Sequence, residues 1–334
     1  MITAFECLLK QNNYIDDKIF DLTGVKDLFS DTTKEILQNN IFGVDLNKES
    51  VEITKISLWL KTADKNKTLA SLENNIKCGN SLIDDPEIAG EMAFDWEKEF
   101  PQVFENGGFD IVVGNPPYFN VQTFGAKSPI VSYLMNRYSE IWQDKSDILF
   151  YFIYKALKIS KGEVGFIISN AFLFSDKAQK LRNYIVEKGR LEKIINFEKY
   201  MIFEEASITS CIVMFGKENR KVKEINLKEK NYSNDEILKY LNGNKEYEIE
   251  LKKDDVFAIV DKQIQKLNTK IDENNSKLQD LVIIGKGMET AANDIFLFES
   301  NNLDFPNEFM KNYISGEGIS RYTIKKQSKE ITIF

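Results

Sequence analysis

Short apolar runs, each ending at a polar residue or a glycine, recur between residues 41 and 215 and constrain the fold more than any other feature. Longer polar or helical stretches separate most of these runs, and this alternation is typical of an α/β fold. The sequence therefore predicts a mostly parallel, doubly wound sheet whose ligand sites lie at the carboxyl ends of the strands. The runs expected to be buried strands are residues 41–44, 76–78, 110–113, 163–168, 191–197 and 208–215.

Two helices between these runs can be anticipated from their residue patterns. Asn47 is a residue type that caps helices, and apolar side chains recur at helical spacing after it. Residues 148–159 are apolar almost all round, so this second helix is expected to pack between the sheet and another element. The face expected on the first helix consists of Ile53, Ile56, Leu60 and Ala63.

Composition excludes several kinds of chemistry. The chain has 334 residues and no histidine, which rules out a Ser-His or Cys-His pair, a histidine base and a histidine-ligated metal, and no metal site is predicted. With a formal net charge of −8, any contact with nucleic acid has to come from a local basic face. No apolar run is long enough to cross a membrane and no signal peptide is visible, so a cytoplasmic protein is expected.

The stretch FDIVVGNPPY, residues 109–118, is the main candidate for chemistry. A β-branched run ends at Gly114, and the two prolines after Asn115 prevent either a helix or a strand from continuing. The stretch is therefore predicted to be a loop at the end of a buried strand. The alternative is a tight surface loop with a stacked tyrosine and no catalytic role.

This loop has the groups needed to activate an amino group on an aromatic ring. The lone pair of such a nitrogen is delocalised into the ring, which makes the nitrogen a poor nucleophile. If the Asn115 side-chain oxygen and the Pro116 carbonyl both accept hydrogen bonds from the amino group, the nitrogen becomes more nucleophilic. Tyr118 can then stack on the ring, a contact worth about 1–3 kcal/mol per base. With a base flipped out of a duplex and a sulfonium methyl donor opposite, this is amine methylation.

Polar residues at the ends of other predicted strands are candidates for binding. Asp45 lies between a strand and a helix, which is where nucleotide-binding folds place a carboxylate for ribose hydroxyls. Asn80 and Ser81 form a polar turn that can offer an amide and backbone groups to a purine. Each is also compatible with an ordinary turn. Because Asp45, Asn80, Asn115 and Asn170 all follow predicted strands, their shared placement favours a ligand site.

These segments resemble the adenine-specific DNA methyltransferases of the gamma class, and more narrowly the methyltransferase part of type IIG restriction-modification enzymes. NPPY is the catalytic motif of that family, and FGVDLNKESVEITKISLWL resembles its acidic-strand motif. KCGNSL resembles the motif that contacts the cofactor base, and DILFYFIYKALKISKGEVGFIISNAFL resembles the segment after the catalytic loop. YMIFEEASITSCIVMF resembles the segment that carries a stacking phenylalanine. The resemblance covers nearly the whole chain and implies a Rossmann-like S-adenosylmethionine-dependent methyltransferase sheet.

The resemblance also implies roles for individual residues. Asp45 is expected to bind the ribose of S-adenosyl-L-methionine, Leu46 to pack on its adenine, and Phe203 to stack on a flipped adenine opposite Tyr118. Many relatives have aspartate at the position of Asn80. The residues implied to bind the cofactor are Asp45, Leu46, Asn80, Ser81 and Asn115. The residues implied to be catalytic are Asn115, Pro116, Pro117, Tyr118 and Phe203.

Three regions are expected from the resemblance and from changes in composition. Residues 1–216 are expected to be the catalytic domain, without the glycine-rich first motif of the family, so that an N-terminal truncation is expected. Residues 217–280 are a charged connecting segment with a helix. KGMETAANDIFLFE and ISGEGISRY resemble the start of a smaller DNA target-recognition domain at residues 281–334. The DNA contacts expected there are Thr290, Asn293 and Arg321.

The sequence therefore predicts a site-specific DNA methyltransferase that acts on the N6 amino group of a flipped-out adenine and belongs to a restriction-modification system. Double-stranded DNA is the expected partner, together with a fused or separate endonuclease domain outside this chain. One alternative is a catalytically inactive fragment that binds DNA or a partner. Another is a methyltransferase acting on a protein glutamine, whose amide nitrogen poses the same lone-pair problem. Cytosine N4 is a further target open to the same loop.

Overall fold

The computed structural model describes residues 1–25, 31–62, 71–188, 190–198, 200–203 and 208–216, and shorter segments between residues 222 and 332. It contains two compact units, Met1–Ile264 and Gln265–Phe334. The domain boundaries expected at residues 216 and 280 stay a prediction. Nowhere in the described ranges does a helix have the length and apolar character needed to cross a membrane.

The N-terminal part of the first unit is built around two short parallel strands. β1 (Gly43–Asp45) pairs with β2 (Ile76–Cys78), so that Asp45 lies opposite Cys78. Both strands occur where the sequence predicted them. Because the pairing is parallel, the polar residues that follow the two strands lie at the same edge of this small sheet.

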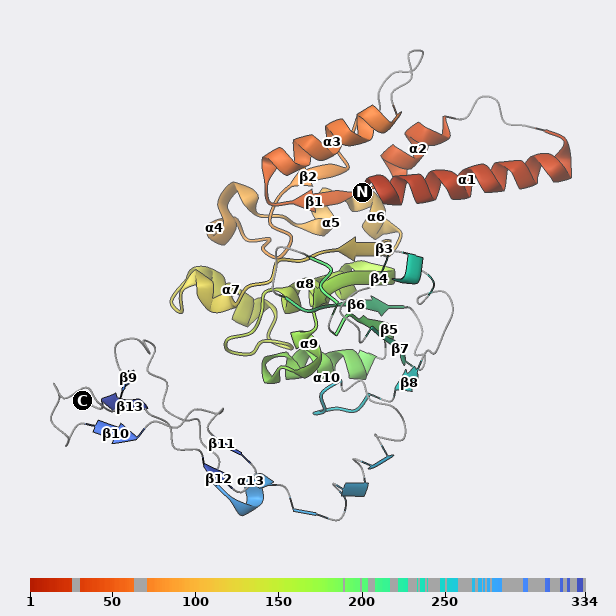
Figure 1. The fold of residues 1–334 in the computed structure, drawn as a ribbon. Helices are drawn as coiled ribbons and strands as arrows, with labels where there is room; N and C mark the ends of the chain where they lie inside the picture. The colour runs from red at the N-terminus through yellow and green to blue at the C-terminus, as the bar shows by residue number, and fades with distance from the viewer. Residues whose placement is uncertain are drawn as a thin grey trace. The chain divides into compact units, whose positions relative to one another are not determined.

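Three helices lie above and beside this pair of strands in the view of Figure 1: α1 (Ile2–Thr23), α2 (Thr32–Asn39) and α3 (Lys48–Thr62). The core that they share is formed by Phe5, Ile36, Leu37, Ile41, Val51, Leu58, Leu72 and Ile76. The cap predicted for α3 is present, because Oδ1 of Asn47 accepts a hydrogen bond from the Ser50 backbone N–H over 2.9 Å. This cap fixes the direction in which the chain leaves β1.

The face that α3 buries differs from the predicted one. Val51, Lys55 and Leu58 are buried, whereas the predicted face is exposed at Ile53, Ile56 and Leu60. Ala63, the last residue of that face, lies outside the described residues. The buried face was hidden in the sequence because a lysine interrupts it.

A six-stranded sheet forms the larger part of the first unit, in the order β3-β4-β6-β5-β7-β8. The α/β class is confirmed, but the prediction of a mostly parallel sheet was wrong. β6 runs antiparallel to both β4 and β5, and β8 runs antiparallel to β7, whereas β3 and β4 are parallel, as are β5 and β7. The strands are β3 (Phe109–Gly114), β4 (Ser160–Ser169), β5 (Leu191–Asn196), β6 (Ser210–Phe215), β7 (Val222–Asn226) and β8 (Tyr247–Ile249).

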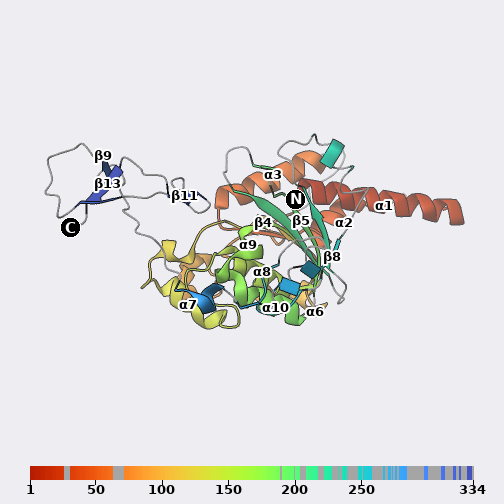
Figure 2. The same ribbon diagram turned by 60° about the horizontal axis from the view of Figure 1, so that its bottom comes forward.

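Helices α8 (Leu149–Ile159), α9 (Ala171–Phe174) and α10 (Gln179–Lys188) lie together on one side of this sheet (Figure 2). α8 buries eight of its eleven residues, as its apolar sequence predicted, and packs against β4. Its side chains form the centre of the main core together with those of β4, β5 and β6. The sheet is thus held by a helix that directly precedes β4 in the chain.

β3 is the edge strand of this sheet, and the prediction that it would be buried was wrong. It pairs with β4, and its side chains Ile111 and Val113 are 63% and 69% exposed. Val112 points to the other face and packs against the main core. The strand therefore carries its functional loop at the margin of the sheet.

Short helices and an aromatic cluster connect the small sheet to β3. The helices are α4 (Pro86–Ala89), α5 (Trp96–Glu99) and α6 (Pro101–Glu105), with the 3-10 turn η1 (Gly90–Met92) between the first two. The ring of Phe42, next to β1, lies 5.3 Å from that of Phe100 and 5.8 Å from that of Phe109 in β3. Phe100 is fully buried. This cluster joins the starts of β1 and β3.

The second unit contains short strands. β13 (Lys329–Thr332) pairs antiparallel with β9 (Leu297–Glu299) and with β10 (Met310–Asn312). β11 (Ile319–Ser320) and β12 (Thr323–Ile324) form a small antiparallel pair. A single-turn helix, α13 (Leu278–Leu281), precedes them in the chain.

Candidate active site

The candidate catalytic loop begins directly after β3. A side chain at Gly114 would bring its Cβ to 3.0 Å from the ring of Phe166 in β4, so the absence of a side chain allows the close packing of the strand end. Asn115 follows and is exposed, while Pro116 is buried and Pro117 is exposed. The buried proline anchors the loop and leaves the asparagine amide at the surface.

Tyr118 folds back onto Asn115. Its hydroxyl lies 2.6 Å from Oδ1 of Asn115 and 3.0 Å from the carbonyl oxygen of Ile167 in β4. A phenol has one proton, so the hydroxyl donates to one of these oxygens at a time. The ring packs against the main core, and burial raises the pKa of Tyr118 above its ordinary value. The asparagine oxygen predicted to accept from a substrate therefore has a partner within the loop itself.

The chain that follows Tyr118 is held by a short antiparallel pairing. The Ile148 backbone N–H donates to the carbonyl of Phe119 over 3.0 Å, and the Val121 N–H donates to the carbonyl of Ser146 over 3.0 Å. The side-chain amide of Asn120 also donates to the Lys145 carbonyl over 2.7 Å. These bonds fix the far end of the catalytic loop to the start of α8.

Asp147 lies within this pairing and was not predicted as a functional residue. Its carboxylate accepts a hydrogen bond from the Leu149 backbone N–H over 3.0 Å. Burial raises the pKa of Asp147 to about 6, and its charge contributes to the raised pKa of Tyr118. In the sequence, Asp147 could be recognised only as a residue at the start of a helix. A carboxylate that titrates near neutral pH beside a candidate catalytic loop is a common feature of functional sites.

Asp45 and Leu46 lie at the end of β1 and are both exposed, Leu46 by 60%. Oδ1 of Asp45 accepts a hydrogen bond from the Asn47 backbone N–H over 2.7 Å. In the described part of the chain, the other carboxylate oxygen has no hydrogen-bond partner. Asp45 therefore presents a free acceptor next to an exposed apolar side chain, which suits a ribose hydroxyl and an adenine face.

Asn80 and Ser81 form a turn after β2, at the same edge of the small sheet as Asp45. Oδ1 of Asn80 accepts from the Leu82 backbone N–H over 3.0 Å, and no described residue accepts from its Nδ2. The carbonyl of Ser81 accepts from Nε1 of Trp96 over 3.0 Å. The turn thus holds its own shape and leaves both N–H donors of the Asn80 side chain without an acceptor among the described residues.

The structure does not bring every predicted residue into this arrangement. Phe203 follows β5 and is partly exposed, and its place on the far face of a base opposite Tyr118 stays a prediction. Asn170 follows β4, as expected, but its side-chain oxygen accepts from the Thr209 hydroxyl over 2.7 Å, and its amide lies 3.3 Å from Oδ1 of Asn196. The residues predicted to contact DNA lie outside the described residues: Thr290, Asn293 and Arg321.

The sequence also gave no indication of the residues that support the Asn80–Ser81 turn. The segment after the catalytic loop contains a 3-10 turn, η2 (Val121–Phe124), and the helix α7 (Pro129–Arg137). Tyr133 and Arg137 of α7 bind the carboxylate of Asp84. These partners are about fifty residues apart in the chain, so no local sequence pattern predicts the contact.

Comparison with known proteins finds a family match within the first unit. Residues 39–203 match the family described as Eco57I restriction-modification methylase, and this region holds both the catalytic loop and the two strand ends just described. Residues 39–203 therefore have the sequence pattern of an Eco57I-type restriction-modification methylase domain.

Among curated proteins, the chain is similar to the type II restriction enzyme and methyltransferase RM.Eco57I of Escherichia coli. The two are 29% identical over 198 residues, which is 56% of this chain and 20% of that protein. Type II methyltransferase M.HincII of Haemophilus influenzae is 26% identical over 179 residues, 49% of this chain and 35% of that protein. The chain thus spans a minor part of the length of these relatives.

Among solved structures, the DrdV–DNA complex matches with a TM-score of 0.50 and 10% identity. The match covers 66% of this chain and 24% of the DrdV chain. At this level of identity the likeness concerns the fold alone. It is consistent with the arrangement of mixed sheet and flanking helices described above.

Proposed function

We propose that this chain is the core of a site-specific DNA methyltransferase. It transfers a methyl group from S-adenosyl-L-methionine to the N6 amino group of an adenine flipped out of duplex DNA. The enzyme belongs to a restriction-modification system of type IIG. A fused or separate endonuclease domain lies outside this chain, and residues 281–334, with Thr290, Asn293 and Arg321, begin the part that reads the DNA sequence.

The observation that carries the proposal is the pairing of Asn115 and Tyr118 at the end of β3. An exposed amide oxygen and an aromatic side chain lie side by side, with the hydroxyl of one 2.6 Å from the oxygen of the other. The Asn115 oxygen and the Pro116 carbonyl accept the two amino hydrogens of the base, and the Tyr118 ring stacks on its face. The acceptors withdraw the lone pair from conjugation and raise the nucleophilicity of the nitrogen.

The residues at the ends of β1 and β2 suit the cofactor. The free oxygen of Asp45 accepts from a ribose hydroxyl, Leu46 covers one face of an adenine, and the Nδ2 of Asn80 donates to a ring nitrogen. The bound cofactor supplies an electrophilic methyl group. Asn115 lies at the end of the neighbouring edge strand and serves both the cofactor and the base.

DNA is the proposed substrate because similar proteins are named as restriction-modification enzymes, and because one similar structure is a complex with DNA. Adenine is favoured over cytosine because Asn115 stands where cytosine enzymes of the resembled family more often have serine. A base offers two faces for stacking, which favours it over a glutamine side chain.

The proposal is tested by transfer of a tritiated methyl group from S-adenosylmethionine to bacterial genomic DNA. The wild type should label DNA, and Asn115→Ala should lower the rate by at least about a hundredfold, because an acceptor that acts in the transition state is lost. Asn106→Ala is the control, since among the described residues the one side-chain hydrogen bond of Asn106 is to the Gln102 carbonyl in α6. Label that enters protein glutamine and not DNA would overturn the proposal.

A further inference from the structure

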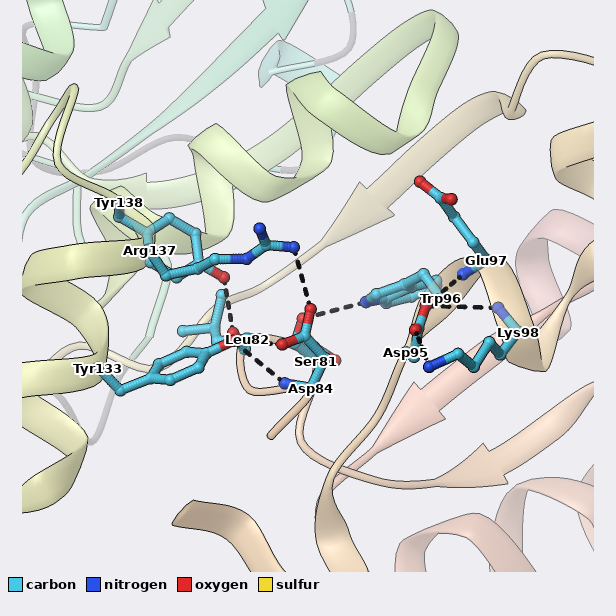
Figure 3. A network of polar contacts seen from close by, with 10 residues as sticks. All are labelled: Ser81, Leu82, Asp84, Asp95, Trp96, Glu97, Lys98, Tyr133, Arg137 and Tyr138. Carbon is cyan, nitrogen blue, oxygen red and sulfur yellow. Dashed lines mark hydrogen bonds and ion pairs between the residues drawn. The ribbon is translucent and has the colours of Figure 1, made fainter. Parts of the chain in front are cut away.

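Three side chains at the end of α7 and just beyond it converge on the chain that follows the Asn80–Ser81 turn (Figure 3). The Tyr133 hydroxyl donates to Oδ1 of Asp84 over 2.7 Å and accepts from the Asp84 backbone N–H over 3.2 Å. Nη2 of Arg137 donates to Oδ2 of the same carboxylate over 3.1 Å. The Tyr138 hydroxyl donates to the carbonyl of Leu82 over 2.7 Å. A single helix end therefore holds residues 82–84 at four atoms.

The opposite side of the turn is held as well. Nε1 of Trp96 donates to the Ser81 carbonyl over 3.0 Å, as Figure 3 shows, and the Phe94 backbone N–H donates to the Ile83 carbonyl over 2.8 Å. Residues 80–84 are thus fixed between α7 on one side and α5 with its preceding strand-like segment on the other. A turn held from two sides presents the amide of Asn80 in one orientation, which is what recognition of a purine edge requires.

The exposure of the Arg137–Asp84 ion pair indicates that this pair contributes to position more than to stability. The side chain of Arg137 is 58% exposed and that of Asp84 is 26% exposed. Exposed ion pairs contribute little to folding free energy. Burial raises the pKa of Tyr133 to about 12, so its hydroxyl stays protonated and remains a donor throughout the physiological range. The Asp84 charge raises the pKa of Arg137 above its ordinary value.

We propose that Tyr133, Arg137 and Asp84 are positioning residues for cofactor binding. They hold the Asn80–Ser81 turn through α7, the helix that follows the catalytic loop in the chain. This role rests on the proposed function, because it assigns the turn to S-adenosylmethionine. The segment beyond Tyr118 is thereby connected to the Asn80–Ser81 turn, so α7 links the catalytic loop to the proposed cofactor-binding turn.

The first test is calorimetric titration of the wild type, Tyr133→Phe and Arg137→Met with S-adenosylmethionine. Each variant should bind roughly tenfold more weakly, as expected when a hydrogen bond to a charged group no longer fixes the site. Lys61→Met is the matched control, because the exposed ammonium of Lys61 pairs with Glu6 over 2.7 Å, between α3 and α1, and has no part in the contacts that hold the turn. Its affinity should equal that of the wild type.

The second test asks whether the effect passes through Asn80. In a double-mutant cycle, adding Tyr133→Phe to Asn80→Ala should weaken binding much less than it weakens the wild type, because the amide that Tyr133 positions is already gone. A general loss of structure would make the two losses additive, and that result would overturn the inference. If Tyr133→Phe lowers the melting temperature markedly, the same double-mutant cycle is measured with Arg137→Met in its place, because the Arg137 side chain is exposed.

The outcomes separate the two proposals. A wild type that does not bind S-adenosylmethionine contradicts the proposed function, and with it the role of the turn. A wild type that binds, together with Tyr133→Phe and Arg137→Met proteins of unchanged affinity, leaves the function intact and overturns only the positioning role.

Discussion

The hydroxyl of Tyr118 lies 2.6 Å from the side-chain oxygen of Asn115, so the tyrosine uses one of the two acceptor positions of that oxygen. The second lone pair of the oxygen can accept from the amino group of the proposed substrate. The tyrosine ring packs against the main core. A change at Tyr118 therefore acts both on the proposed acceptor and on the proposed stacking ring.

Tyr118→Phe should separate the two roles of this residue. The variant keeps the ring and removes the competing hydroxyl, so turnover on adenine should equal or exceed that of the wild type. Tyr118→Ala removes the ring and should lower turnover by roughly tenfold or more, with little effect on the cofactor Kd. Steady-state rates of the two variants, with cofactor titrations, make the comparison. If Tyr118→Phe is as impaired as Tyr118→Ala, the hydroxyl has a positive role; equal losses in turnover and cofactor affinity would make the tyrosine structural.

Asp45→Asn should weaken cofactor binding. Asparagine keeps the side-chain oxygen that accepts from the Asn47 backbone N–H, but the charged acceptor for the ribose is lost. We expect the Kd for S-adenosylmethionine to rise by roughly tenfold at unchanged melting temperature. Asp85→Asn is the matched control, because Asp85 caps α4 and lies outside the proposed cofactor contacts. An Asp45→Asn protein with wild-type affinity would remove Asp45 from the site.

Asp147 should make the stability of the protein fall as pH rises from about 4 to about 6. Burial raises the pKa of Asp147 from 3.8 to about 6. The native state therefore binds more protons than the unfolded chain in this window, and this contribution to stability is fully present below about pH 4 and lost as pH rises through about 6. Asp147→Asn keeps an oxygen for the Leu149 N–H and should flatten the dependence of melting temperature on pH in this window.

Asp95→Asn is the control of opposite sign. Burial alone would raise the pKa of Asp95, but hydrogen bonds from Lys98 lower it below its usual value. Its contribution to stability is present above the unfolded pKa and is lost as pH falls. The Asp95→Asn protein should keep the slope between pH 4 and pH 6. If Asp147→Asn and Asp95→Asn change that slope alike, the assignment to Asp147 fails.

Phe100→Ala should be among the most destabilising single changes near the site. The ring is fully buried and lies within 5.9 Å, centroid to centroid, of four others: those of Phe42, Phe94, Trp96 and Phe109. Removing it leaves a cavity between the two sheets and should cost about 3–5 kcal/mol, measured by denaturant unfolding. Phe124→Ala is the control, because Phe124 is 37% exposed and should cost about 1 kcal/mol. Equal losses would show that the cluster does not join the sheets.

The positions of the strand ends were predictable because glycine and proline interrupt the chain locally. Gly114 and the two prolines after Asn115 define the end of β3, and Asn47 marks the start of α3 through its cap. These signals act within a few residues, so they can be recognised in a single sequence without an alignment. The α/β class was predicted from the same pattern of apolar runs interrupted by glycine, proline and polar residues.

The face of α3 and the order of the strands were not predictable in the same way. The buried face of α3 includes Lys55, whose ammonium is neutralised by Glu52 and Glu73 at 3.1 and 2.6 Å, so its pattern does not look apolar. The place of β6 between β4 and β5 depends on pairings between distant residues, and an apolar run does not encode its direction. The hydrogen bond from Tyr133 to Asp84 likewise joins residues that are distant in the chain, so no local pattern predicts it.

The most direct measurement is the identity of the methylated nucleoside. DNA from cells that express the wild type, digested to nucleosides and separated by mass, should contain N6-methyladenine. DNA from cells that express Asn115→Ala should lack N6-methyladenine. DNA from cells that express the control Asn106→Ala should contain it at the wild-type level. Methylation found at cytosine N4, or equal N6-methyladenine with and without the Asn115 side chain, would contradict the assignment of this loop to adenine N6.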